Sequence, residues 1–376
     1  MAITASELHE ALEEIAPLRH AESWDNTGEL ISGVTSKVER VLLTIDLTEP
    51  VLAEAIDANV DSVIAYHPPI FSPLQRIDAG TPTGRITLGA IRAGLHVYSP
   101  HTALDATPGG VNDWLADCFG SGDRRALEQA ADGKTGSMCK IVTFCPQDSV
   151  DTIRDGLAAV GAGTIGEYKR CSFELVGTGT FHGSSRSQPN VGTSGRLERV
   201  GEVRLEMVCP SNALGGAVRA LRSFHPYEEP PVDIYALEPA PLRETGAGRR
   251  VVLDRSVSMR TLVDRVRSRT SVKRLQVARS HERPQKHRII GVCVGAGGSM
   301  LDTAISQGCT VFVTGEMRHH DVLKAQASGC SVILAGHTNT ERGYLPVLAK
   351  RLAASLGSDA PEFIVSRKDR DPLRTS

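Results

Sequence analysis

Three segments of the sequence place histidine and carboxylate side chains directly after short apolar runs that are typical of buried strands. The segments are IAYHPPIF, YSPHTALDATPGGVND and ILAGHTNTER. Their candidate residues are Tyr66 and His67 in the first, His101 and Asp105 in the second, and His337 and Glu341 in the third. Because ligands in open α/β sheets bind just beyond the carboxyl ends of the strands, we expect these side chains to converge on one point.

The combination of imidazole and carboxylate groups without a thiolate points to a metal site. Such ligands suit zinc, iron, manganese, cobalt or nickel as divalent ions. Two carboxylates also allow one of them to bridge two ions about 3.5–4 Å apart, as in hydrolytic two-metal sites. The sequence therefore predicts a divalent transition metal, with one or two ions per chain.

The spacing of these residues is weak support by itself. A histidine is followed four residues later by Asp or Glu at His9, His101, His225 and His337, whereas roughly one or two such pairs are expected by chance. Only His101 and His337 lie on loops that leave a predicted strand. On spacing alone, the alternative that these are capping and turn residues with incidental histidines stays open.

Two residues near the end of the run TVFVTGE are candidates for supporting roles. Glu316 closes this run, and His320 follows it. Either residue could orient a metal ligand or move a proton, although the start of an ordinary helix explains His320 equally well. The loop formed by Trp24, Asp25 and Asn26 could face the same site, and a structural turn is an equally good interpretation of it.

The elements that would position these residues alternate between strands and helices in the first and last thirds of the chain. Expected strands cover residues 41–48, 62–69, 95–102, 287–298, 310–316 and 331–341, and expected helices cover 50–60, 85–94, 111–120, 299–308, 319–329 and 342–356. This alternation predicts an α/β fold with a mostly parallel sheet covered on both faces. Thr4 and Glu7 fit a capping box that would begin a helix near the N-terminus.

The middle of the chain has a different pattern. Residues 121–136 are polar and contain glycine, which favours a linker. Beyond them the order strand, helix, strand, strand, helix, strand is the ferredoxin-like α+β pattern. We therefore predict a discontinuous metal-binding α/β core over residues 1–128 and 247–376, interrupted by a ferredoxin-like domain over residues 137–240.

Composition places the chain among ordinary soluble globular proteins. The 376 residues carry a formal net charge of −2, so bulk charge gives no reason to expect nucleic acid or a membrane surface as a partner. No apolar run approaches the ~20 residues that span a bilayer. The acidic N-terminal stretch does not resemble a signal peptide, and eight scattered cysteines without a C-x-x-C pair favour reduced thiols. We expect a cytoplasmic protein.

Several of these segments together resemble the Nif-three-like family, whose members are named GTP cyclohydrolase 1 type 2 homologs. The matching stretches are SWDNTGELISG, YHPPIF, SPHTALDATPGGVNDWLA, TGEMRHHD and GHTNTERG, in the order of the family. Within the middle domain, CSFELVGTGTF and SFHPYEEPPVDIYALEP resemble the longer members that carry a PII-like insert. The resemblance extends over nearly the whole chain.

The resemblance implies a particular set of metal ligands. His67, Asp105 and Glu341 would hold one ion, and His337 with a bridging Glu341 would hold a second. His101 lies at the same cluster. The chain departs from many bacterial members at Tyr66, where they have a second histidine, and a phenol with a pKa near 10 is a poorer ligand than imidazole at pH 7.

The resemblance also implies an activity and an assembly. The first hypothesis is a metal-dependent hydrolase that acts on a small molecule, either a nucleotide or a heterocycle such as GTP. The second is a non-enzymatic protein that handles metal or binds a partner. In both, the resemblance implies a homohexameric toroid, built from dimers or trimers, with metal sites facing an inner cavity.

Overall fold

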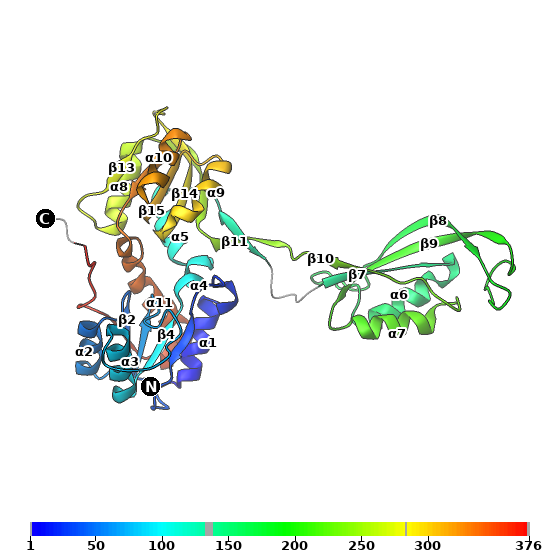
Figure 1. The fold of residues 1–376 in the computed structure, drawn as a ribbon, viewed down its shortest axis with the longest axis horizontal. Helices are drawn as coiled ribbons and strands as arrows, with labels where there is room; N and C mark the ends of the chain where they lie inside the picture. The colour runs from blue at the N-terminus through cyan, green and yellow to red at the C-terminus, as the bar shows by residue number, and fades with distance from the viewer. Residues whose placement is uncertain (1, 132–137, 283, 374–376) are drawn as a thin grey trace. The chain divides into compact units, whose positions relative to one another are not determined.

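The computed structural model describes residues 2–131, 138–282 and 284–373. The chain forms two compact units, which we call the core and the insert (Figure 1). The core contains Met1–Ala130 and Leu242–Ser376, and the insert contains Ala131–Pro241. The core is an α/β structure, so the predicted fold class is confirmed for it.

The first sheet of the core has five strands. In spatial order they are β1 (Gly28–Ile31), β4 (His96–Ser99), β3 (Ser62–Ala65), β2 (Arg40–Thr44) and β17 (Glu362–Val365). All neighbouring pairs are parallel except β1 with β4. Helices cover both faces: α1 (Ala5–Ile15) and α11 (Leu345–Leu356) pack on one face, and α2 (Glu49–Asp57) and α3 (Pro82–Ala93) on the other.

The second sheet of the core has six strands and is mixed. In spatial order they are β13 (Gln276–Ala278), β16 (Ser331–Leu334), β15 (Val311–Glu316), β14 (His287–Ala296), β12 (Arg249–Val257) and β5 (Gly122–Arg125). Strands β14, β15 and β16 are parallel, and the other pairings are antiparallel. Its helices are α8 (Met259–Thr270), α9 (Leu301–Ser306) and α10 (His319–Ala327).

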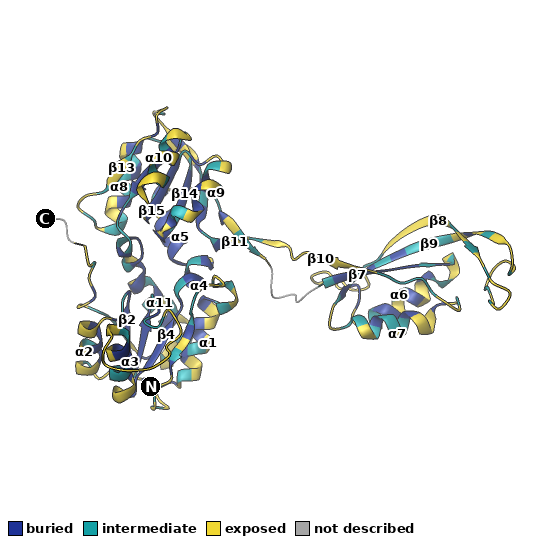
Figure 2. Ribbon diagram, viewed as in Figure 1, coloured by how far each residue is buried: buried dark blue, intermediate teal, exposed yellow. Residues whose placement is uncertain are grey.

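One hydrophobic cluster joins the two sheets. It contains Leu43 and Ile64 of the first sheet, Val292 and Val313 of the second, and the ring of Trp114 from α5 (Val111–Ala116), which is 7% exposed. Figure 2 shows the strands of both sheets as buried and the outer surfaces of the helices as exposed. Because the two sheets share one hydrophobic cluster, the strand ends of one sheet are held in a fixed position relative to those of the other.

Several predicted boundaries are wrong. Strands β2 and β3 end at Thr44 and Ala65, earlier than predicted, because the chain turns at the polar and proline residues that follow. The predicted linker contains β5 and the strand β6 (Glu128–Ala131), and residues 132–136 lie outside the described part of the chain. The polar β5 lies at the edge of its sheet, where one row of backbone groups and much of the side-chain surface are solvated, so it lacks the apolar pattern of a central strand.

The insert contains β7 (Met138–Cys145), α6 (Val150–Ala159), β8 (Phe173–His182), β9 (Leu197–Pro210), α7 (Leu214–Phe224) and β10 (Asp233–Leu237). The antiparallel sheet has the order β10-β7-β9-β8, which is the arrangement of a ferredoxin-like domain. Both helices pack on the same face of this sheet. Figure 2 shows β8 and β10 as largely exposed.

The cysteines and the helices of this fold bear on the environment of the chain. All eight cysteines are free thiols, most of them buried in the cores, as predicted. Within the described residues, no helix combines the length and the apolar character required to cross a membrane.

A buried ion pair links the helical segment before β5 to strand β12. The guanidinium of Arg249 is 1% exposed and donates to both carboxylate oxygens of Asp113, at 2.8 and 3.1 Å. Its remaining donors reach four backbone carbonyls, those of Ala106, Thr107, Gly246 and Gly248. Removing one partner leaves an uncompensated buried charge, which costs far more than the loss of an exposed pair.

We expect Arg249→Ala to lower the free energy of unfolding of the core by about 3–5 kcal/mol. Chemical denaturation followed by circular dichroism measures this change. Arg260→Ala on α8 is the control, because the Arg260 side chain is 92% exposed and its pair with Asp264 contributes about 0–1 kcal/mol. Equal losses of stability in the two variants would contradict the role assigned to the buried pair.

Candidate metal centre

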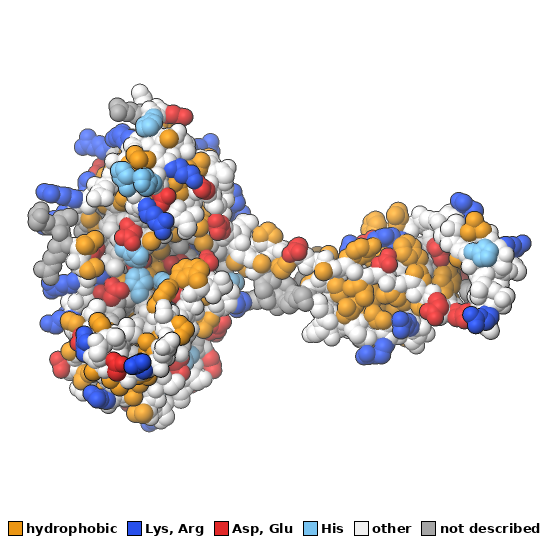
Figure 3. Space-filling model, viewed as in Figure 1, with side chains coloured by type: hydrophobic (Ala, Val, Ile, Leu, Met, Phe, Trp, Pro, Cys, Tyr) orange, Lys and Arg blue, Asp and Glu red, His pale blue; other side chains and the backbone are white. Residues whose placement is uncertain are grey.

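The ends of three strands meet at one cavity of the core, with a volume of about 560 Å³. His67 follows β3, His101 follows β4 at the start of α4 (His101–Ala106), and His337 follows β16. The residues that the sequence predicts as ligands all line this cavity: His67, His101, Asp105, His337 and Glu341. In Figure 3, histidine side chains lie in the middle of the core beside acidic and hydrophobic ones.

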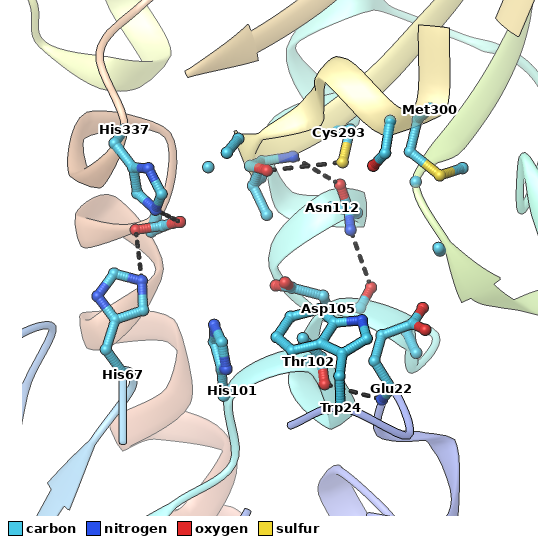
Figure 4. Close-up of a pocket in the computed structure, with 18 of the residues that line it drawn as sticks. Glu22, Trp24, His67, His101, Thr102, Asp105, Asn112, Cys293, Met300 and His337 are labelled. Atoms are coloured by element: carbon cyan, nitrogen blue, oxygen red, sulfur yellow. Dashed lines mark hydrogen bonds and ion pairs between the residues drawn. The ribbon is translucent and has the colours of Figure 1, made fainter. Parts of the chain in front are cut away.

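His67, His337 and Glu341 form a compact group. The Nε2 atom of His67 lies 3.5 Å from Oε2 of Glu341, and Nε2 of His337 lies 3.4 Å from Oε1. Their candidate ligand atoms all lie within 4.8 Å of one another. Figure 4 shows the rings of His67 and His337 on opposite sides of a carboxylate, with His101 next to His67. The geometry suits one ion bound by two imidazoles and a carboxylate.

Glu341 gives the strongest physical indication that the group suits a cation. Its side chain is 2% exposed, and its Oε2 atom is buried without a hydrogen-bond donor. Buried charges are normally paired or bound to a metal, and the groups that face this carboxylate are the imidazoles of His67 and His337. The donor set therefore fits a divalent transition metal.

Each of the three histidines contacts a carboxylate through its Nδ1 atom. The partners are Asp46 for His67 at 2.9 Å, Glu316 for His337 at 3.0 Å, and Asp25 for His101 at 2.7 Å. An Nδ1–H that donates to a carboxylate fixes the tautomer and leaves Nε2 as a lone-pair donor. The Nδ1 contacts thus fix the orientation of the three rings.

Asp105 and Tyr66 form a separate pair beside this group. The buried phenol of Tyr66 donates to Oδ1 of Asp105 at 2.5 Å. Burial, followed by the nearby Asp105 carboxylate, raises the pKa of Tyr66 well above its ordinary value. The phenol therefore stays protonated at neutral pH and acts as a hydrogen-bond donor to Asp105.

The protonation of two groups departs from ordinary values when no metal is bound. Burial lowers the pKa of His67, but the nearby carboxylates of Asp46 and Glu341 outweigh it and raise the value to about 10. Burial raises the pKa of Asp105 to about 7, against the opposing effect of His101. A protonated His67 has no lone pair for a metal, so metal binding must displace this proton.

Strand β14 approaches the group so closely that only glycine fits at one position. A Cβ atom at Gly295 would lie 2.6 Å from Oε1 of Glu341 and 3.1 Å from Nε2 of His337, and the φ of Gly295 is +63°. The backbone N–H of Gly295 donates to Oγ1 of Thr340 at 2.8 Å, which holds the turn Thr338–Thr340 against the strand. Here the backbone itself shapes the space for the ion.

The C-terminal segment ties both sides of the site together. The carboxylate of Asp369 accepts a hydrogen bond from the backbone N–H of Ile45 at 2.8 Å, next to Asp46. The same carboxylate pairs with Arg342, which follows Glu341. Asp369 is 8% exposed, so this link is shielded from solvent and joins the two sequence-distant parts of the site.

The two supporting candidates from the sequence have different positions. Glu316 contacts His337 directly, as described above. His320 is exposed, its ring packs against that of His319, and it does not belong to the described residues that line the cavity. The structure thus places Glu316 at the site and gives His320 the environment of an ordinary residue at the start of α10.

Sequence reasoning missed Asp46 and left the role of Asp25 open. Asp46 follows the buried run VLLTI, so it has the same position after a strand that singled out the histidines. Asp25 lies in a loop, and its contacts with His101 and Thr102 depend on tertiary structure. The first could have been found from its position, whereas the second could not.

These features define a class: an α/β protein with a histidine–carboxylate group that could hold a metal, and with a ferredoxin-like insert. The chain belongs to the Duf34/NIF3 (NGG1p interacting factor 3) family, which it matches over residues 3–372. It is 33% identical to a Listeria innocua protein named GTP cyclohydrolase 1 type 2 homolog, over 96% of each chain. It is 35% identical to NIF3-like protein 1 of Bos taurus, over 96% of this chain and 90% of the relative. Among solved structures, a Bacillus cereus protein related to NIF3 matches with a TM-score of 0.67 and 30% identity, over 99% of each chain.

We expect Gly295→Ala to weaken metal binding at least about tenfold, because the added methyl group would displace the carboxylate of Glu341 and the ring of His337. Metal analysis after reconstitution and titration against a chelator measure the change. Gly308→Ala is the matched control: its φ is +77°, but the nearest atom to a Cβ there is 3.7 Å away and belongs to Ile289. Equal metal affinities in the two variants would show that Gly295 does not shape the metal centre.

Proposed function

We propose that the protein is a metal-dependent hydrolase that acts on a nucleotide or a heterocycle such as GTP. The observation that supports this best is the pair of imidazole nitrogens directed at the buried Glu341 carboxylate, inside a cavity of about 560 Å³. A cavity of this size holds a small organic molecule. The candidate metal ligands therefore lie inside the cavity that would bind the substrate.

His67, His337 and Glu341 would hold the first ion. A divalent transition metal supplies Lewis acidity, which makes water acidic enough to ionise near pH 7. Asp46 and Glu316 keep the two rings oriented through Nδ1. A second ion would draw on Asp105 and His101, which line the same cavity.

Asp105 is suited to hold a proton near the centre. When no metal is bound, its pKa is about 7, so its carboxyl group changes protonation state in the neutral range, and a nearby cation would lower this pKa. Its Oδ1 atom accepts the Tyr66 hydrogen bond, so Oδ2 is the atom that would take up a proton. A general acid or base is most effective when its pKa lies near the working pH.

The names of relatives suggest the substrate. Several relatives, from Listeria and Bacillus among others, are named GTP cyclohydrolase 1 type 2 homolog. Hydrolytic opening of a purine ring is a reaction that an activated water can perform at an electron-poor ring carbon. This is a proposal for the present chain, because family membership does not fix chemistry.

We also propose that the chain assembles into a homohexameric ring. An exposed apolar surface on the insert supports association: Phe173 and Leu175 alternate along β8, point to the same side of the sheet, and are 62% and 56% exposed. Exposed apolar groups that gather on one face are typical of interfaces between subunits.

We expect wild-type protein reconstituted with metal to turn over GTP or a member of a panel of nucleotides and heterocycles, and Glu341→Ala to lose at least about 100-fold in kcat. Glu10→Ala, on the exposed side of α1, is the control and should retain full activity. Metal content is measured in parallel. Identical turnover in wild type and Glu341→Ala would remove the hydrolase proposal, and full metal retention in His67→Ala/Glu341→Ala would remove the metal centre.

For the assembly, we expect light scattering after size exclusion to give a mass of six times the 40.2 kDa chain. Phe173→Glu should lower this mass, because a charge would replace an apolar contact. Val34→Glu is the control, since Val34 is 86% exposed in the core and is not part of the insert surface. A monomeric wild-type protein at micromolar concentration would contradict the ring.

A further inference from the structure

Two exposed aromatic rings lie in the cavity of the metal centre. Trp24 is 59% exposed and Phe71 is 52% exposed, and their ring centroids are 6.1 Å apart at an interplanar angle of 50°. Both residues line the cavity. Large apolar rings that are left open to solvent beside a polar centre are typical of ligand contacts.

A continuous row of rings leads from this aromatic pair to the metal centre. The ring of Trp24 meets that of His101 edge to face at 6.1 Å, His101 meets His67 at 5.2 Å, and His67 meets His337 at 5.4 Å. Figure 4 shows Trp24 on the far side of His101 from His67, with Glu22 beside it. One molecule could therefore contact the aromatic pair and also extend toward the centre.

Apart from its histidines, the ionisable side chains that line the cavity are mostly acidic. Its lining carries the carboxylates of Glu22, Asp105, Glu128 and Glu341, and the described lining residues include no lysine or arginine. Figure 4 shows Glu22 on the side of the cavity away from His67 and His337. Carboxylates accept hydrogen bonds from N–H groups and repel phosphates.

We propose that Trp24 and Phe71 form a stacking site for an uncharged planar heterocycle rich in N–H donors, and that the cavity selects this ring system without a phosphate chain. The inference rests on the proposed function, since it names the substrate class of the same cavity. An aminopurine or a related fused pyrimidine has the required shape and donors. A triphosphate would meet four carboxylates, and the described lining offers neither a lysine nor an arginine to bind it.

Stacking and hydrogen bonding would act together in this site. The Trp24 and Phe71 rings provide the π surface, and any base can use it. The Glu22 carboxylate, which is exposed next to Trp24, would accept from an exocyclic amine or a ring N–H. Glu128 accepts a hydrogen bond from Thr303 through Oε1, which leaves Oε2 for the ligand.

The test measures binding without turnover. Isothermal calorimetry is performed with guanosine, inosine and magnesium-free GTP on metal-stripped protein and on the zinc-reconstituted protein. In the stripped protein, we expect guanosine to bind at least about tenfold more tightly than GTP at low salt, and the difference to shrink as salt screens the repulsion. Inosine, which lacks the exocyclic amine, should bind more weakly than guanosine.

Substitutions at Trp24 test whether its aromatic ring provides the binding. Trp24→Ala should weaken guanosine binding at least about fivefold, the lower end for loss of one stacked base, and Trp24→Phe should restore most of it. Tyr168→Ala is the control, because Tyr168 is an aromatic residue 75% exposed on the insert. Zinc content of each variant is measured, since Asp25 next to Trp24 orients His101.

Two results would overturn the proposal. One is guanosine affinity in Trp24→Ala equal to wild type with zinc content unchanged. The other is GTP binding more tightly than guanosine to the stripped protein at low salt. The hydrolase proposal is tested separately by the turnover of wild type and Glu341→Ala. Guanosine binding that depends on Trp24, without any turnover, would contradict only the hydrolase proposal. Turnover that depends on Glu341, without guanosine binding that depends on Trp24, would contradict only the stacking site.

Discussion

The buried carboxylate of Glu341 is the constraint on which the centre of the structure depends. A carboxylate that is 2% exposed must be compensated, because its desolvation costs several kcal/mol. The groups that face it are the imidazoles of His67 and His337, whose orientation is fixed by further carboxylates. When no metal is bound, the protonated His67 compensates part of this negative charge, and a divalent cation would replace its proton. The close approach of Gly295 sets the size of that space.

The residues of the candidate metal centre come from elements that are far apart in the sequence. His67 and Asp46 follow strands of the first sheet, whereas His337 and Glu341 follow a strand of the second sheet and Gly295 lies in one. The centre therefore forms only where the shared hydrophobic cluster holds both sheets together. The carboxylate of Asp369 strengthens this relation, since it contacts the backbone beside Asp46 and the side chain beside Glu341.

Much of the core could be predicted from the sequence, because buried parallel strands are continuous apolar runs and the residues after them mark the site. The predicted ligand residues line one cavity for this reason. The short polar strand β5 escaped prediction because an edge strand lacks the apolar signal. The contact of Asp25 with His101 and the exposure of Trp24 also escaped, since loop positions depend on packing between segments that no local pattern records.

The two-stranded sheet of β6 and β11 (Pro241–Ala247) bears on how the insert could have been gained or lost in evolution. These strands are neighbours, and the insert lies between them in the sequence. The chain thus departs from the core and returns to it at adjacent points. A gene fragment could have entered or been deleted here in a single event, with a tight turn closing the gap and little change in loop-closure entropy elsewhere. The core and the insert each have a hydrophobic cluster of their own, so such an event would leave the packing of the core intact.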